Sequence, residues 1–167
     1  MDIGWTAVTA ALADLAADAT ISETCDVMAE AFLSAVGASS GPLYAGAFRS
    51  AGAAVSDRLN LDGPALAAWI EGMSNGILAR GGAKPGDKTM VDAWVPAATA
   101  ATAAAAAGKN EKGVLTAAAE AAHAGAQHTE NLESRRGRSA KLGERSLGHI
   151  DPGAASAAII LTAMLEE

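Results

Sequence analysis

The sequence is poor in several kinds of residue, and each shortage narrows what the chain can be. It contains one cysteine, Cys25, so it has no internal disulfide framework, and a reducing compartment such as the cytoplasm is expected. The net charge of −7 argues against nucleic acid as the main partner. The sequence contains neither an apolar run of transmembrane length nor a signal peptide, so we expect a soluble protein with no membrane partner.

Aromatic residues are also scarce, at 4%, and much of the apolar half of the sequence is alanine. Alanine is the best helix former and adds little bulk, so the composition predicts an all-α protein with closely packed helices. We expect the 167 residues (1-167) to form a single antiparallel up-and-down helix bundle. The spacing of larger apolar residues predicts seven helices, at about 4–18, 23–35, 40–56, 63–80, 91–107, 114–132 and 152–165.

Three glycine-rich connections, at about 37–42, 81–89 and 137–153, follow the second, fourth and sixth of these helices. Alternate connections of an antiparallel bundle lie at the same end, so the three loops should share one rim. The third loop cannot be a regular helix, because four glycines and a proline interrupt it. It carries Arg138, Arg145 and His149, and it runs into a helix that Asp151 should cap. A cationic loop before a helix N-terminus suits a phosphorylated ligand.

Plainer interpretations exist for most of these features. The first loop can be a tight helix connection with Ser40 as a cap, and the third can be a long ordered connection. Ser22 is expected to cap the second helix. Asp87 and Lys88 are expected to be surface charges, and Cys25 a core residue rather than a nucleophile.

Three motifs make the chain resemble the nucleotide-binding subunit or domain of dihydroxyacetone kinases, the DhaL type. They are Gly37-Ala38-Ser39-Ser40-Gly41-Pro42-Leu43, then Gly86-Asp87-Lys88-Thr89-Met90, and then Gly137-Arg138 with the run from Leu142 to Gly153. They occur in the family's order over nearly the whole chain. The resemblance implies a barrel of eight antiparallel helices with an ADP/ATP–magnesium site in the loops at one end. It also implies a kinase function, in which this part donates a phosphoryl group to a small ketose that a DhaK-type partner subunit holds.

Matched position by position, the resemblance implies roles for ten residues. It places Ser39, Ser40 and Gly41 near the nucleotide phosphates and Thr89 and Met90 near the nucleotide, with Met90 against the base. It places Asp151, Pro152 and Gly153 beside the nucleoside. Arg138 reaches the phosphates and is the candidate catalytic residue, and Asp2 is the candidate Mg2+ ligand.

The sequence departs from the family pattern at its start. The family's metal site uses three aspartates, and Asp2-Ile3-Gly4 matches only the end of that motif. The first helix of the family is missing. Because the three loop motifs look intact, we favour an N-terminally incomplete domain over a natural short form. Either way we expect weaker binding of metal–nucleotide, and an apolar groove that promotes instability or self-association, for example as a homodimer. Lys141 also stands where the family has tyrosine.

Three functions remain open at this stage. The first is the kinase role, with either free ATP or a phosphotransferase-system relay as phosphoryl source. The second is a catalytically weakened nucleotide-binding regulatory or interaction subunit, which the shortage of aspartates favours. The third is lipid binding within the helix barrel. Dihydroxyacetone and longer ketoses are both candidate substrates, because the ketose site belongs to the partner.

Overall fold

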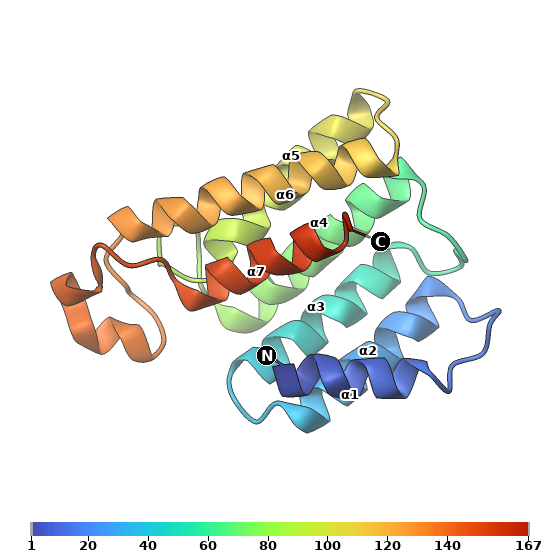
Figure 1. Cartoon of the computed structure of the whole chain (residues 1–167), viewed down its shortest axis with the longest axis horizontal. Coiled ribbons are helices and arrows are strands. Elements are labelled where there is room, and N and C mark those ends of the chain that lie inside the picture. Colours follow the sequence, from blue (N-terminus) through green and yellow to red (C-terminus); the bar gives the residue numbers. More distant parts are fainter. Residues whose placement is uncertain (1, 167) are drawn as a thin grey trace.

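The computed structural model describes residues 2–166, which form seven α-helices and two short 3₁₀-helices (Figure 1). The predicted all-α class and the seven α-helices are confirmed within this part of the chain. The α-helices are α1 (Asp2–Leu12), α2 (Ile21–Ala35), α3 (Ser40–Ala54), α4 (Gly63–Gly81), α5 (Val91–Ala106), α6 (Glu111–His128) and α7 (Pro152–Ala163). The 3₁₀-helices are η1 (Thr129–Asn131) and η2 (Arg138–Ser146).

Each α-helix packs against the next one in the chain, and successive helices run in opposite directions (Figure 1). α4 also contacts α6, and α5 contacts α7, which closes the bundle on the C-terminal side. In Figure 1 the connections after α2, α4 and α6 all lie at the left-hand end of the molecule. The expectation that the three glycine-rich loops share one rim is therefore confirmed.

The helices of the bundle approach closely where their residues are small. A Cβ atom on Gly76 of α4 would lie 2.7 Å from the Cα of Ala47 in α3, so a side chain here would push the two helices apart. Larger side chains fill the space between α1, α2 and α3. Trp5, Phe32 and Phe48 meet edge to face there, with ring centroids 5.7 to 6.1 Å apart. Three of the six aromatic residues thus form one cluster between these helices.

Two predicted N-cap residues, Ser22 and Ser40, were wrong. Thr20, rather than Ser22, caps α2, because its side chain accepts from the backbone of Glu23 while the Glu23 carboxylate accepts from the Thr20 backbone. Ser40 is the first residue of α3, and the residue before it, Ser39, makes no capping bond with its side chain. The capping of α7 by Asp151, followed by Pro152 in the first turn, is confirmed.

Several predicted boundaries also differ from the structure. α1 ends at Leu12 instead of residue 18, and turns lead from there to Thr20. α6 starts at Glu111, where Asn110 caps it, and ends at His128. The third loop, expected to contain no helix, includes the nine-residue η2, which Gly143 interrupts with a φ of 55°. None of the helices between residues 2 and 166 is long and apolar enough to cross a membrane.

Candidate functional site

The first loop reaches α3 through a tight turn. The Gly41 N–H donates to the Ala38 carbonyl at 2.9 Å. A Cβ atom on Gly41 would overlap the carbonyl oxygen of Val36, so glycine is required at this position. Ser39 is exposed and Ser40 is half-buried beside it. Two hydroxyl groups thus stand at the N-terminus of α3, where the helix dipole favours an anion.

The second loop is held in shape by the carboxylate of Asp92, in the first turn of α5. Its two oxygens accept from the backbone N–H groups of Gly86 and Thr89, the latter at 2.8 Å. The Thr89 hydroxyl in turn accepts from the N–H of Val91 at 3.2 Å. These bonds fix Thr89 and Met90, both half-buried, at the entrance to α5.

Asp87 and Lys88 are buried, so the expectation that they are surface charges was wrong. They are 3% and 4% exposed. One carboxylate oxygen of Asp87 accepts from the Lys84 N–H at 3.1 Å and lies 3.3 Å from the Arg136 guanidinium. The Lys84 N–H first, and Arg136 second, keep the pKa of Asp87 below its ordinary value.

Arg136 also bonds the second loop directly, through a hydrogen bond from its guanidinium to the Gly82 carbonyl at 2.9 Å. The backbone N–H of Arg135 adds a bond to the Asp87 carbonyl at 3.1 Å. The sequence analysis missed this connection between the second and third loops. The one available signal was the pair of basic residues, Arg135 and Arg136, that precedes the third loop.

The third loop carries Arg138 at the start of η2. The loop projects beyond the helix ends at the left of Figure 1. The Arg138 guanidinium is exposed and, among the residues described, has no hydrogen-bond partner. Lys141 and Arg145 are exposed on the same 3₁₀-helix, so positive charge gathers here on a chain with a net charge of −7. His149 is exposed as well.

The third loop ends at Asp151, which caps α7. One of its carboxylate oxygens accepts from the Ala154 N–H at 2.8 Å, and its own N–H donates to the Thr129 hydroxyl at 2.8 Å. Burial raises the pKa of Asp151 above its ordinary value, partly against the lowering effect of the Ala154 N–H. A Cβ atom on Gly153 would lie 3.3 Å from the Met90 nitrogen, so the start of α7 packs on the second loop.

The predicted site residues therefore fall into three groups at one end of the bundle. Thr89 and Met90 lie beside Asp151 and Gly153, and Pro152 stands exposed between the latter two. Leu43, which follows the first loop in α3, would meet a Cβ atom on Gly81 at 3.0 Å, so the start of α3 lies against the start of the second loop. The rim thus offers two helix N-termini, hydroxyl groups and an exposed guanidinium, all of which are groups that bind phosphate.

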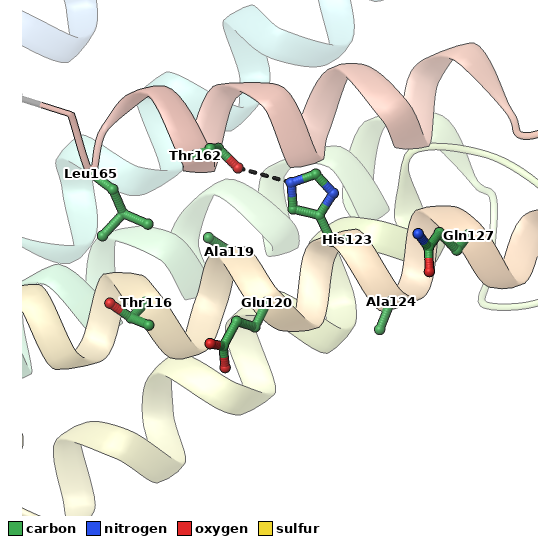
Figure 2. Close-up of a pocket in the computed structure, with 8 residues that line it drawn as sticks. All are labelled: Thr116, Ala119, Glu120, His123, Ala124, Gln127, Thr162 and Leu165. Carbon is green, nitrogen blue, oxygen red and sulfur yellow. Dashed lines mark hydrogen bonds between the residues drawn. The ribbon is translucent and has the colours of Figure 1, made fainter.

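Two further hollows lie along α6. The groove between α6 and α7 is drawn in Figure 2, where His123 and Thr162 face each other across it. His123 Nε2 and Thr162 Oγ1 are 3.0 Å apart, which links the two helices, and none of the predicted nucleotide-binding residues lines this groove. The hollow between α5 and α6 reaches the second loop at Pro85 and Gly86.

The DAK2 domain family matches residues 1–166 of this chain. The chain belongs to the DAK2 family. As a DAK2 domain it is 40% identical over 124 residues to the ADP-binding subunit DhaL of the PEP-dependent dihydroxyacetone kinase of Escherichia coli, covering 74% of this chain and 59% of that one. It is 40% identical to the L-erythrulose 1-kinase of Mycolicibacterium smegmatis over 137 residues, covering 82% of this chain and 24% of that one.

The helical fold of DAK2 domains is also seen in a solved structure. The dihydroxyacetone kinase of C. freundii in complex with AMP-PNP and Mg2+ matches with a TM-score of 0.63 and 31% identity, covering 88% of this chain and 23% of that one. The predicted DhaL-type resemblance is therefore confirmed. The chain spans about three fifths of the length of the DhaL subunits it matches.

The DAK2 domain described here is poorly provided with metal ligands. Between residues 2 and 166, no group of three or more His, Cys, Asp and Glu side chains is arranged to hold an ion. Asp2 is exposed at the start of α1, and Mg2+ prefers six oxygen ligands in octahedral arrangement. The described residues therefore offer groups that can bind phosphate but do not by themselves fit a magnesium ion.

Proposed function

We propose that this chain is the ADP/ATP-binding part of a kinase for dihydroxyacetone or a related small ketose. The observation that carries the proposal is the packing of Gly153 on Met90, which puts the N-terminus of α7 beside the second loop and next to the loop that bears Arg138. The names of the relatives, an ADP-binding subunit and an erythrulose kinase among them, support the same function.

In this proposal, Ser39, Ser40 and Gly41 bind the nucleotide phosphates at the start of α3. Thr89 and Met90 contact the nucleotide, with Met90 against the base, and Asp151, Pro152 and Gly153 close the site beside the nucleoside. Phosphoryl transfer depends on positioning and on neutralising the charge of the transferred group. Arg138 is the catalytic residue in this account, because its exposed guanidinium is free to pair with that group.

Asp2 is proposed to contribute one carboxylate oxygen to a magnesium ion that the nucleotide brings. Since the other described residues supply no further cluster of ligands, we expect this chain to bind magnesium–nucleotide less tightly than its longer relatives do. No step of the reaction is assigned to the metal on this chain.

The proposed partner is a DhaK-type subunit that holds the ketose. The phosphoryl group comes either from free ATP or from a phosphotransferase-system donor that recharges bound ADP. With one unpaired cysteine, which is buried, the protein suits a reducing compartment such as the cytoplasm. A homodimer is a further proposal, since Ile3 of α1 and Ile159 of α7 are 70% and 65% exposed.

The test is reconstitution of ketose phosphorylation. The chain is mixed with a DhaK-type subunit loaded with dihydroxyacetone, and phosphorylated product is measured with ATP or with a phosphotransferase donor. We expect turnover that Arg138→Ala reduces at least about tenfold and that Arg49→Ala, an exposed arginine on α3, leaves unchanged. Nucleotide binding without turnover would favour the second candidate, a regulatory nucleotide-binding subunit, which the shortage of metal ligands supports.

A further inference from the structure

Lys88 is a buried lysine whose Nζ is enclosed by backbone carbonyl groups. It donates to the carbonyl oxygens of Thr129 at 2.8 Å, Leu132 at 3.0 Å and Ser146 at 2.7 Å. An ammonium group has three N–H donors, so each one has a carbonyl partner. All three partners belong to the segment from η1 to the end of η2, whereas Lys88 belongs to the second loop.

The backbone of Lys88 adds a second unusual feature. Its φ is 59°, and it is the one non-glycine residue with positive φ among those described. A positive φ is unfavourable for most residues with a side chain. Glycine and asparagine are the residues usually found in this backbone conformation. Burying a charged group is costly as well unless its hydrogen bonds are satisfied. A glycine would suit the turn better, so the lysine side chain must serve another purpose.

Thr129 and Ser146, two of the residues whose carbonyl groups Lys88 bonds, also make side-chain hydrogen bonds to the third loop. The hydroxyl of Thr129 accepts from the N–H of Asp151, the cap of α7. The hydroxyl of Ser146 accepts from the Ser134 N–H at 2.9 Å and donates to the Gly143 carbonyl at 2.7 Å. Lys88 therefore bonds the chain on both sides of Arg138, at Leu132 before it and at Ser146 after it.

We propose that Lys88 is a positioning residue for phosphate binding, which fixes the chain before and after Arg138 on the second loop and thereby sets the position of Arg138. This inference rests on the proposed nucleotide function. Lys88 does not reach the ligand, because its three donors are occupied by the carbonyl groups. It acts through the position of Arg138.

The test is a double-mutant cycle on ADP binding. Lys88→Met keeps the length of the side chain and the cost of the positive φ but removes the donors. We expect ADP affinity to fall about ten- to a hundredfold in Lys88→Met and by a similar factor in Arg138→Ala. In the double variant, Arg138→Ala should lower the ADP affinity little further, because an Arg138 that Lys88→Met has already displaced no longer contributes to binding. Lys112→Met, an exposed lysine in α6, is the matched control and should bind ADP as the unmodified chain does.

Additive losses in the cycle would overturn the proposal, since a merely destabilising substitution lowers affinity without cancelling the effect of Arg138. Unchanged affinity in Lys88→Met would overturn it too. If Lys88→Met does not fold, the cycle is run with Lys88→Gly, which removes the donors and suits the positive φ, and the same criteria apply.

Hydrogen exchange of the ligand-free protein separates this inference from the proposed function. Lys88→Met should lose protection at the bonded amides of the loop, such as Ser134 and Asp151, while the central turns of α4 and α5 keep theirs. Retained protection in the loop would contradict the positioning role even if ADP binds. A third outcome is that Lys88→Met loses protection in the loop while the unmodified chain binds no ADP. That result would confirm that Lys88 holds the loop, but it would refute both the nucleotide function and the role of Lys88 in phosphate binding.

Discussion

Gly153 in the first turn of α7 lies against Met90 at the entrance to α5. A Cβ atom on Gly153 would sit 3.3 Å from the Met90 nitrogen and 2.9 Å from a carboxylate oxygen of Asp151. Two segments separated by some sixty residues of sequence thus meet at one helix N-terminus. This contact brings together the two segments that we propose to lie against the base and beside the nucleoside.

Gly41→Ala tests the tight turn before α3. The added methyl group would overlap the carbonyl oxygen of Val36, and backbone must move to admit it, so we expect the free energy of unfolding to fall by about 1–3 kcal/mol. Gly37→Ala is the control, since a Cβ atom there would meet nothing within 4 Å. Denaturant unfolding measures both variants, and equal stability of the two would show that the turn is not constrained as described.

Asp151→Asn tests the buried carboxyl at the cap of α7. Since burial raises the pKa of Asp151 in the folded protein, its contribution to stability is fully present below its ordinary pKa of 3.8 and is lost as the pH rises through the raised value. Asparagine caps helices about as well and does not titrate. The free energy of unfolding of Asp151→Asn, relative to that of the unmodified chain, should therefore increase as the pH rises from 3.8 through the raised pKa. Above the raised pKa the difference should stay constant. Denaturant unfolding at several pH values measures this difference, and a decrease with rising pH would show that the pKa of Asp151 is not raised by folding.

Asp87→Asn should show the opposite pH dependence. The N–H of Lys84 and then the Arg136 guanidinium lower the pKa of Asp87, so its contribution is present above its ordinary pKa of 3.8 and is lost as the pH falls through the lowered value. The variant should be less stable than the unmodified chain at neutral pH and approach it in acid. Asp57→Asn, at an exposed residue between α3 and α4, is the control. A loss of stability in Asp87→Asn that stays the same in acid would refute the proposed cause of the lowered pKa.

Cys25 should be unreactive in the folded protein. It is 2% exposed, and the Trp69 indole Nε1 donates to its sulfur at 3.3 Å. Burial raises the pKa of the Cys25 thiol, so little of the reactive thiolate forms at neutral pH. We expect labelling by a thiol reagent to follow the unfolding of the protein across a denaturant series. Rapid labelling under native conditions would contradict the predicted role of Cys25 as a core residue.

The features predicted correctly from the sequence are those that depend on nearby residues. The cap of α7 needs only Asp151 and the Pro152 that follows it, and the shared rim needs only the number of helices between glycine-rich loops. α1 was predicted too long because its alanines favour helix throughout, whereas the capping box at Thr20 and Glu23 starts α2 at Ile21 and requires a turn before it.

The role of Lys88 could not be predicted from the sequence, because its partners are distant. The three carbonyl groups that it bonds lie 41, 44 and 58 residues along the chain, and any residue type presents a carbonyl. A lysine in a glycine-rich loop is most often exposed, so the usual interpretation was the wrong one. The assignment of individual residues to the nucleotide remains a prediction from the resemblance to the DAK2 family.

The most direct test of the account is a calorimetric titration of ADP into this chain, with magnesium and with EDTA, beside Arg138→Ala and Arg49→Ala. We predict saturable binding, weaker than that of a full-length DhaL subunit, which Arg138→Ala reduces at least about tenfold and Arg49→Ala does not change. An affinity in the low micromolar range with magnesium would contradict the expected weakness of the metal site. Absence of saturable binding, or equal affinities of the two arginine variants, would contradict the nucleotide site itself.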